Sequence, residues 1–190
     1  MKLTTDEHNK KVVEYKGKEG KVVLKKVQID DDVDLDSHVG WLCTYYVYDD
    51  FGLLRFVIPP KAVEKLIANN WNFSSPNLNQ IVEEICFQYH YDHRNRMISK
   101  KVSGAGEVFL VYDYRDRLAM TQDTNLRNQG KCLVTVYDNL NRPKQTYIWA
   151  NSQTADLHRN TANTTTTDYP NHSSFSSAIL LTEAFCDNYN

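Results

Sequence analysis

Runs of apolar and aromatic residues alternate along the chain with short, strongly polar segments. The stretch FLVYDYRDRLAM, residues 109–120, shows the pattern, because apolar residues on both sides enclose the polar segment from Asp113 to Arg117. Similar segments begin at Asp6, Gly17, Asp49, Asp92 and Asp138. Internal repetition of this kind indicates a series of equivalent structural units.

The repeated polar segment has the form D-x-x-[G/N/D]-[R/K] and is typical of a tight turn. An Asp carboxylate at the first position of a type I turn accepts backbone hydrogen bonds, and the fourth position then needs a positive φ, which Gly, Asn and Asp tolerate best. The fourth positions here are Asn9, Gly20, Gly52, Asn95, Asp116 and Asn141. A type I turn followed by a left-handed residue is a common three-residue hairpin loop with a bulge. The sequence therefore predicts β-hairpins over residues 86–98, 107–119 and 132–147, with positive φ at the fourth positions.

The Asp and the basic residue of each motif flank the hairpin loop and should face each other across it. The predicted pairs are Asp92 with Arg96, Asp113 with Arg117, and Asp138 with Arg142, whereas Leu53 replaces the basic residue in the motif of Asp49 and Gly52. An exposed pair of this type contributes only about 0 to 1 kcal/mol, so the carboxylates are assigned mainly to the turns. The sequence gives no reason to assign a catalytic, cofactor-binding or metal-binding role to them.

Two regions depart from the hairpin pattern. Residues 59–85 place Ala62, Val63, Leu66 and Ile67 on one helical stripe and Leu78, Ile81, Val82 and Ile85 on a second, with Ser75 and Pro76 as a cap and first helical residue. We expect a two-helix insert that covers one face of the sheet. Residues 150–177 are rich in Ser, Thr and Asn and poor in apolar residues, which predicts a long mobile loop.

Composition and charge narrow the possible partners. The chain of 190 residues has 22 basic and 24 acidic residues and a formal charge of -2, so it lacks the positive field that attracts nucleic acid or anionic membrane. The polar N-terminal stretch does not resemble a signal peptide, and no stretch is apolar enough to insert into a membrane. No C-x-x-C pair is present, and Cys43, Cys86 and Cys132 each lie five residues before a repeat Tyr, which predicts buried, unreactive thiols.

Two further patterns suggest chemistry weakly. His90 and His93 could hold a metal ion only if His158 or His172 supplied a third ligand and the turn corrected their geometry. The segment Ser103–Gly106, SGAG, lies between predicted strands and opens no helix, so it lacks the positive helix end of a phosphate-binding loop. Both patterns are better explained as parts of hairpins.

The units Tyr91–Met97, Tyr112–Leu118 and Tyr137–Pro143 resemble the YD repeats of RHS proteins, and the order of features resembles the early repeat region of large bacterial RHS-repeat proteins. The resemblance is weaker at Gly17, which stands in the Asp position, and at Leu53, so those two hairpins are expected to be less regular. It implies a mainly all-β fold, a curved antiparallel sheet of successive hairpins, in a single domain over residues 1–190.

The same resemblance implies a non-enzymatic structural role in a β-shell that encloses or presents cargo, at the cell surface or outside the cell, with no cofactor. Expected partners are other RHS-repeat segments or a second copy that pairs through an open sheet edge. A carbohydrate-binding surface module is the alternative, and a glycan is then the ligand. Residues 180–185 read as a strand and Asp187–Asn190 as a seventh turn. We expect this strand either to recruit another strand or to be poorly ordered.

Overall fold

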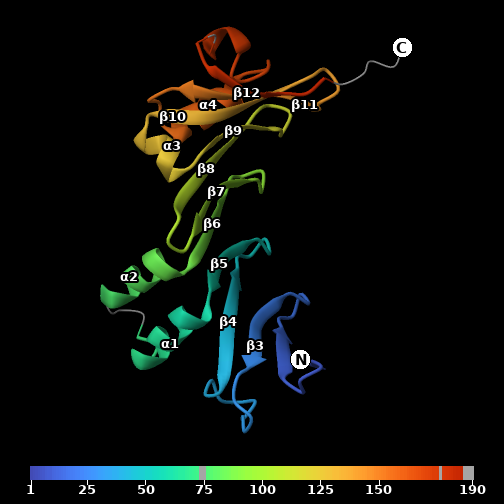
Figure 1. Ribbon diagram of the computed structural model, residues 1–190, viewed down its shortest axis with the longest axis vertical. Helices are drawn as coiled ribbons and strands as arrows, with labels where there is room; N and C mark the ends of the chain where they lie inside the picture. The colour runs from blue at the N-terminus through green and yellow to red at the C-terminus, as the bar shows by residue number, and fades with distance from the viewer. Residues whose placement is uncertain (73–75, 176, 186–190) are drawn as a thin grey trace. The chain divides into compact units, whose positions relative to one another are not determined.

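The computed structural model describes residues 1–72, 76–175 and 177–185 (Figure 1). Its twelve strands follow one another in the sheet in the same order as in the chain. The strands are β1 (Lys2–Thr5), β2 (Lys11–Lys16), β3 (Val22–Gln28), β4 (Trp41–Tyr48), β5 (Leu54–Ile58), β6 (Phe87–Tyr91), β7 (Met97–Val102), β8 (Gly106–Tyr112), β9 (Leu118–Gln122), β10 (Lys131–Tyr137), β11 (Pro143–Ala150) and β12 (Ile179–Glu183). The helices are α1 (Pro60–Ala68), α2 (Pro76–Ile85), α3 (Thr124–Asn128), α4 (Ala155–Thr164) and the 3-10 helix η1 (His172–Phe175). The predicted all-β class is confirmed.

The predicted hairpins are present as β6 with β7, β8 with β9, and β10 with β11. The strand pairs from β1 to β6 and from β8 to β12 are antiparallel. Tyr112 pairs with Leu118, whereas Val111 pairs with Met120, so the register shifts by one residue next to the turn. This shift is the bulge that a three-residue loop with a left-handed residue requires.

The contacts within the chain group it into two compact units. Unit 1 comprises Met1–His90 and Lys101–Gly104, and unit 2 comprises Tyr91–Lys100 and Ala105–Asn190. The single-domain prediction is neither met nor contradicted by this grouping, since two compact units can belong to one domain. Three of the six turns lie in each unit.

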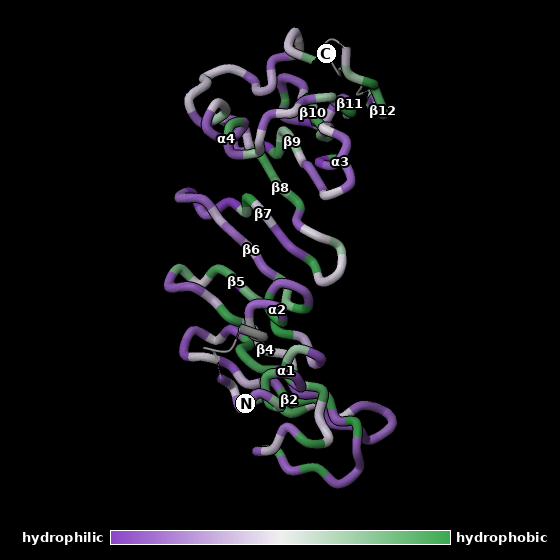
Figure 2. Tube along the Cα trace, turned by 90° about the vertical axis from the view of Figure 1, so that its left-hand side faces the viewer, coloured by the Kyte–Doolittle hydropathy of each residue, from purple (hydrophilic) through white to green (hydrophobic). Residues whose placement is uncertain are grey.

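The core of unit 1 lies between its strands and the predicted helical insert. Val13, Trp41 and Cys43 pack with Val63 of α1, and Ala62 packs with Ile81, Ile85 and Cys86 in a second cluster. In Figure 2 the hydrophobic stretches of β2, β4 and α1 are drawn in green. The two-helix insert is therefore confirmed, although Ser75 of the predicted cap lies outside the described residues.

A long connection between β3 and β4 in unit 1 is held by a buried lysine. The Lys26 side chain is among the buried polar groups, and its ammonium donates to the carbonyl oxygens of Leu35 (2.6 Å) and Ser37 (2.8 Å). The Trp41 indole donates to the carbonyl of Asp34 at 2.9 Å. These donors hold the connection through its backbone carbonyl groups.

The prediction of a long loop in unit 2 is wrong. Residues 150–177 were expected to be a long loop, but they contain α4 and η1, and Ala162 and Phe175 are 0% and 1% exposed in the cluster with Val134. The stripe was missed because its buried members are two alanines and a histidine, Ala155, Ala162 and His158. Thr154 caps the helix by accepting from the backbone N–H of Leu157 at 3.3 Å. Polar composition thus concealed a helix that packs through small residues.

The end of the chain is described up to Phe185. The predicted strand is confirmed as β12, which pairs with β11 and has all five residues exposed. The predicted seventh turn at Asp187–Asn190, together with Cys186, lies outside the described residues. Among the described residues, no helix is long and apolar enough to cross a membrane.

Candidate functional site

The six polar segments all form the same turn. At the fourth position φ is 61° for Asn9, 60° for Asn95, and 61° for Asp116 and Asn141, and the glycines Gly20 and Gly52 have φ of 78° and 73°. The predicted positive φ values are confirmed. In each turn the N–H of the first residue donates to the carbonyl of the fifth residue, and the N–H of the fourth residue donates to the carbonyl of the first, at 2.8 to 3.1 Å.

The Asp carboxylate of the turn uses both of its oxygens in the three turns of unit 2. In the turn 113–117, Oδ1 of Asp113 accepts from the backbone N–H groups of Arg115 (2.9 Å) and Arg117 (3.0 Å), and Oδ2 accepts from the Arg117 side chain (2.7 Å). Asp92 and Asp138 repeat this arrangement with Arg96 and Arg142. The predicted pairs are therefore confirmed. Each carboxylate is thus held by donors of its own turn.

Two of these pairs are not the exposed pairs that the sequence suggested, and the side chains of Arg96 and Asp92 are only 11% and 13% exposed. The Asp113 and Arg117 side chains are only 1% and 9% exposed, whereas those of Asp138 and Arg142 are 18% and 40% exposed. A buried pair is costly to break, because the partner left behind is a charge without solvent. The pair of Asp113 and Arg117 thus contributes to more than the register of its hairpin.

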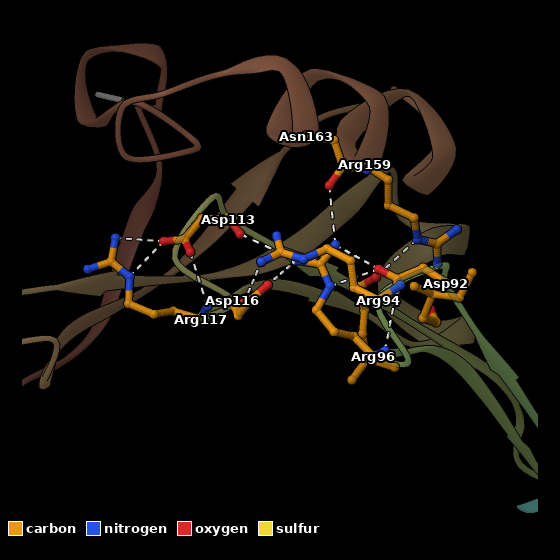
Figure 3. A network of polar contacts seen from close by, with 10 residues as sticks. Asp92, Arg94, Arg96, Asp113, Asp116, Arg117, Arg159 and Asn163 are labelled. Atoms are coloured by element: carbon orange, nitrogen blue, oxygen red, sulfur yellow. Dashed lines mark hydrogen bonds and ion pairs between the residues drawn. The ribbon is translucent and has the colours of Figure 1, made fainter. Parts of the chain in front are cut away.

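Two of these arginines also reach the next turn, and sequence reasoning missed this connection. Arg96 donates to Asp116 at 2.8 Å (Figure 3), and Arg117 donates to Asn141 at 3.0 Å. Both acceptors are the left-handed residues of the following turns. The side chains of Arg94 and Arg115 support the same acceptors at 2.6 and 3.3 Å. We call this linked series of the turns 92–96, 113–117 and 138–142 the turn ladder.

The repeat tyrosines are part of the turn ladder as well. The guanidinium of Arg96 lies 5.1 Å from the ring centroid of Tyr112, and that of Arg117 lies 4.8 Å from the ring centroid of Tyr137. These are cation–π distances. The Tyr that precedes one turn is therefore covered by the Arg of the turn before it, which explains why Tyr and Arg recur together at this spacing.

Helix α4 and the segment after it are hydrogen-bonded to the turn ladder and its strands. Asn163 accepts from Arg96 at 3.2 Å, and Asp168 accepts from Arg117 at 2.5 Å. Arg159 donates to the backbone carbonyls of Leu110 (3.1 Å) and Ile98 (2.5 Å). Figure 3 shows Arg159 and Asn163 extending from this segment toward the turns. The polar residues of this segment, which led to the prediction of a loop, make the hydrogen bonds that attach it to the turns and strands.

Electrostatics favours the charged forms of these groups. Burial acts to raise the pKa of the Asp92 carboxyl, but hydrogen bonds from the side chain and backbone of Arg96 outweigh it, so the pKa is lowered. The pKa of Asp138 is lowered chiefly by the backbone N–H of Arg142. Burial acts against the charged Arg117, yet its bonds to Asp113 and Asp168 raise its pKa. All three groups are therefore ionised at neutral pH.

The three turns of unit 1 keep the backbone geometry without the cross-turn bonds of the turn ladder. The turn 17–21 has the same backbone hydrogen bonds as the other turns, and so does the turn 49–53. The prediction that these two hairpins are less regular is therefore wrong for their backbone. Lys21 lies 5.5 Å from the ring centroid of Tyr48, and Arg55 stands 3.8 Å from Asp49 in place of the missing basic residue. Gly20 and Gly52 have no side chain that could accept a bond from a preceding turn.

The weaker candidates are distributed over the fold. His90 is on β6 and His93 is in the turn 92–96, while His158 is buried and bonded to the Tyr169 hydroxyl at 2.6 Å. Among the described residues, no three His, Cys, Asp or Glu side chains are grouped as a metal site. Cys43, Cys86 and Cys132 are buried as predicted, and burial raises the pKa of the latter two thiols to about 11. The segment Ser103–Gly106 comprises the turn between β7 and β8 and the first residue of β8.

Comparison with known proteins bears on the fold alone. No family model matches the chain, and no curated protein matches it. Similar solved structures are a TcdB2-TccC3-Cdc42 complex (TM-score 0.52, 17% identity) and a Photorhabdus luminescens Tc holotoxin pore with a mutated TccC3 (TM-score 0.51, 18% identity). The chain shares its fold with Tc toxin components. The matches cover 76% and 77% of this chain but only 6% of the matched chains, so this chain spans a small part of their length. A TcdB2-TccC3-TEV complex gives the same TM-score of 0.52 at 17% identity.

Proposed function

We propose that the chain is a non-enzymatic structural module of the RHS-repeat type, whose hairpins form part of a β-shell that encloses or presents cargo at the bacterial surface. The observation that carries the proposal is the turn ladder. Its arginines join the turn of one hairpin to the turn of the next, by a hydrogen bond to a side-chain acceptor and by contact with a tyrosine ring. Such links stiffen a sheet that must hold its shape over many hairpins.

The chemistry of the repeated residues supports a structural role. Asp92, Asp113 and Asp138 have both carboxylate oxygens occupied by N–H donors of their own turns. The rings of Tyr112 and Tyr137 are each covered by a guanidinium. The residues that recur are therefore used internally. The similarity in fold to parts of Tc toxin complexes is consistent with a module that works inside a multi-protein assembly.

Strand β12 provides the surface through which such a module would meet a partner. It is the last strand in the order of the sheet, and Ile179, Leu180 and Leu181 are 63%, 46% and 51% exposed. An exposed apolar edge strand offers unpaired backbone groups to another strand. The proposed partner is a β-strand of another RHS-repeat segment, or of a second copy of this chain.

The proposal is tested by sedimentation over a range of protein concentrations, combined with hydrogen exchange. The protein should associate reversibly, and the amides of Ile179–Glu183 should gain protection as the concentration rises. Leu181→Lys should abolish association, because a charge on an edge strand opposes pairing. Leu140→Lys, a control at a 70% exposed leucine in the turn 138–142, should leave association unchanged. A strict monomer with strong protection over β12 at all concentrations would overturn the proposal.

A further inference from the structure

Unit 2 contains a cavity of about 250 Å³ at the strand ends opposite the turn ladder, where α3 joins β9 to β10 and β11 leads into α4. Its lining residues are Phe109, Gln122, Arg127, Gly130 and residues 151–155. Ordinary small-molecule sites begin at about 300 Å³, so a cavity of this volume suits a small ligand.

The cavity carries one positive charge. Arg127 is the one ionisable residue of the lining, all of which lies in the described part of the chain. Its guanidinium donates to the backbone carbonyl of Glu107 from two nitrogens (both 3.3 Å) and to the hydroxyl of Thr124 (3.1 Å). Arg117 and Arg159, in contrast, each pair with a carboxylate. Within residues 1–72, 76–175 and 177–185, Arg127 bonds only neutral acceptors, so its charge is not compensated by an acidic side chain.

The Arg127 guanidinium is held in one orientation. It lies 4.6 Å from the ring centroid of Phe109, which is also part of the lining. The acidic residues that adjoin the lining in the chain are engaged elsewhere. Asp123 caps α3 by accepting from the backbone N–H of Leu126 at 2.7 Å, and Asp156 pairs with a different arginine of α4. A planar cation fixed in this way loses little freedom when it binds an anion.

The segment before α4 adds neutral donors beside this charge. Oδ1 of Asn151 accepts from the backbone N–H of Gln153 at 2.8 Å, which leaves the Nδ2 amide of Asn151 as a donor. The Ser152 hydroxyl and the Gln153 side-chain amide make no hydrogen bond to other described residues. Ser152 and Gln153 are exposed, so a ligand can reach them from solvent. A cation surrounded by amide and hydroxyl donors is suited to the oxygens of an anion.

We propose that this cavity binds a small oxyanion, a carboxylate or phosphate group that is either free or carried by a small molecule. Hydrogen bonds from a guanidinium to an anionic oxygen are stronger than those between neutral groups. The bonds of Arg127 to Glu107 and Thr124 use three of its five N–H donors, so two remain for the ligand. The site adds a ligand to a module whose proposed role is structural, and it holds whether or not β12 recruits a second chain.

The test is titration of the full chain with sodium phosphate and, separately, with sodium succinate, at an ionic strength kept constant with sodium chloride. Backbone amide chemical shifts should change saturably at Arg127 and at residues 151–155. Arg127→Gln removes the charge and should weaken binding about tenfold or more, as the loss of a charge-assisted hydrogen bond requires. Arg115→Gln is the matched control, because Arg115 bonds the neutral groups of Tyr114 and Asn141 and does not line the cavity.

A second variant separates binding from folding, because Arg127 also ties α3 to β8. Gln153→Ala changes an exposed side chain, leaves the contacts of Arg127 intact, and should weaken binding about fivefold. Saturable binding of either anion with this pattern supports the site, and the anion that binds more tightly identifies the group it prefers. The proposal is overturned if neither anion shifts residues 151–155 saturably, if Arg115→Gln weakens binding as much as Arg127→Gln, or if Gln153→Ala binds as tightly as the unaltered chain.

Discussion

Unit 1 and unit 2 build the same turn three times each but hold their turns together differently. In unit 2 the left-handed positions are Asn95, Asp116 and Asn141, and the basic positions are Arg96, Arg117 and Arg142. In unit 1 the left-handed positions are Asn9, Gly20 and Gly52, and the fifth positions are Lys10, Lys21 and Leu53. The backbone hydrogen bonds are the same in both sets. Turn formation therefore needs only the local motif, whereas linking turns needs a particular pair of side chains.

The pair consists of an arginine and a side-chain acceptor. A guanidinium presents several N–H donors in a fixed plane, so Arg117 bonds its own carboxylate, the acceptor of the next turn and Asp168 at once. A lysine ammonium is a compact charge on a flexible stem, and Lys21 bonds Glu19 within its own turn at 3.2 Å. The regular form of the repeat thus makes contacts between hairpins that the hairpin itself does not require.

The helices α1 and α4 also differ in how they pack on their units. Helix α1 of unit 1 packs through Ala62, Val63 and Leu66, an ordinary apolar stripe. Helix α4 of unit 2 buries Ala155, Ala162 and His158, and it is fixed by polar bonds from Arg159 and by the aromatic residue Phe175 that follows it. We expect the two packed segments to contribute similarly to the free energy of unfolding of their units, despite their different composition.

The largest effect is expected at Phe175. Its side chain is 1% exposed and stacks edge-on against Tyr147 at 5.3 Å, so Phe175→Ala should lower the free energy of unfolding of unit 2 by about 3 to 5 kcal/mol. Leu66→Ala, at a 2% exposed residue of α1, should cost unit 1 about 2 to 5 kcal/mol. Urea denaturation with hydrogen exchange in each unit measures both. A loss below about 1 kcal/mol for Phe175→Ala would show that the segment after α4 adds little to the stability of the core of unit 2.

The next effect concerns the buried arginine. Arg117→Ala leaves the Asp113 carboxylate, 1% exposed, without its cation, and should cost about 3 kcal/mol. The corresponding change in unit 1, Lys21→Ala, removes a pair whose partner Glu19 is 68% exposed, and should cost less than about 1 kcal/mol. Equal losses for the two variants in urea denaturation would remove the distinction between the two kinds of turn.

Much of this arrangement could be predicted from the sequence, and the omissions have physical causes. The turns, the left-handed residues and the pairs such as Asp113 with Arg117 follow from local chemistry at fixed spacing, and all were found. The bond from Arg117 to Asn141 joins residues 24 apart, and no local rule specifies it. Helix α4 was missed because its buried stripe includes His158, a residue type that periodicity arguments treat as polar.

Two histidines whose pKa is lowered should make both units sensitive to mild acid, and unit 2 more so. Burial lowers the pKa of His158, and burial together with Lys26 lowers that of His38. Below the unfolded pKa of about 6.5 the unfolded chain binds protons that the folded chain does not, so stability falls as the pH drops toward the lowered folded pKa. The slope cannot exceed about 1.4 kcal/mol per pH unit for each histidine.

Urea midpoints measured from neutral pH down to the acid side of the histidine range check this expectation. His158→Phe should flatten the pH dependence of unit 2 and leave that of unit 1 unchanged, because the two histidines lie in different units. His158 is only 3% exposed, so its contribution should be the larger one. A pH profile of unit 2 that keeps its slope in the variant would assign the effect to other groups.

The smallest expected effect is the most direct test of the turn ladder, because it separates the two roles of a left-handed residue. Turn chemistry alone predicts that Asn141→Gly is neutral or mildly stabilising, since glycine adopts positive φ readily. The turn ladder predicts instead a loss of about 0.5 to 1 kcal/mol, because the Asn141 side chain accepts from Arg117 and Arg115. Asn9→Gly is the matched control, with the same φ of 61° in a turn of unit 1 that has no arginine before it. Thermal or urea denaturation of the two variants should show a loss at Asn141 and none at Asn9. Equal stability of both variants would mean that the links between turns add nothing to what each turn provides alone.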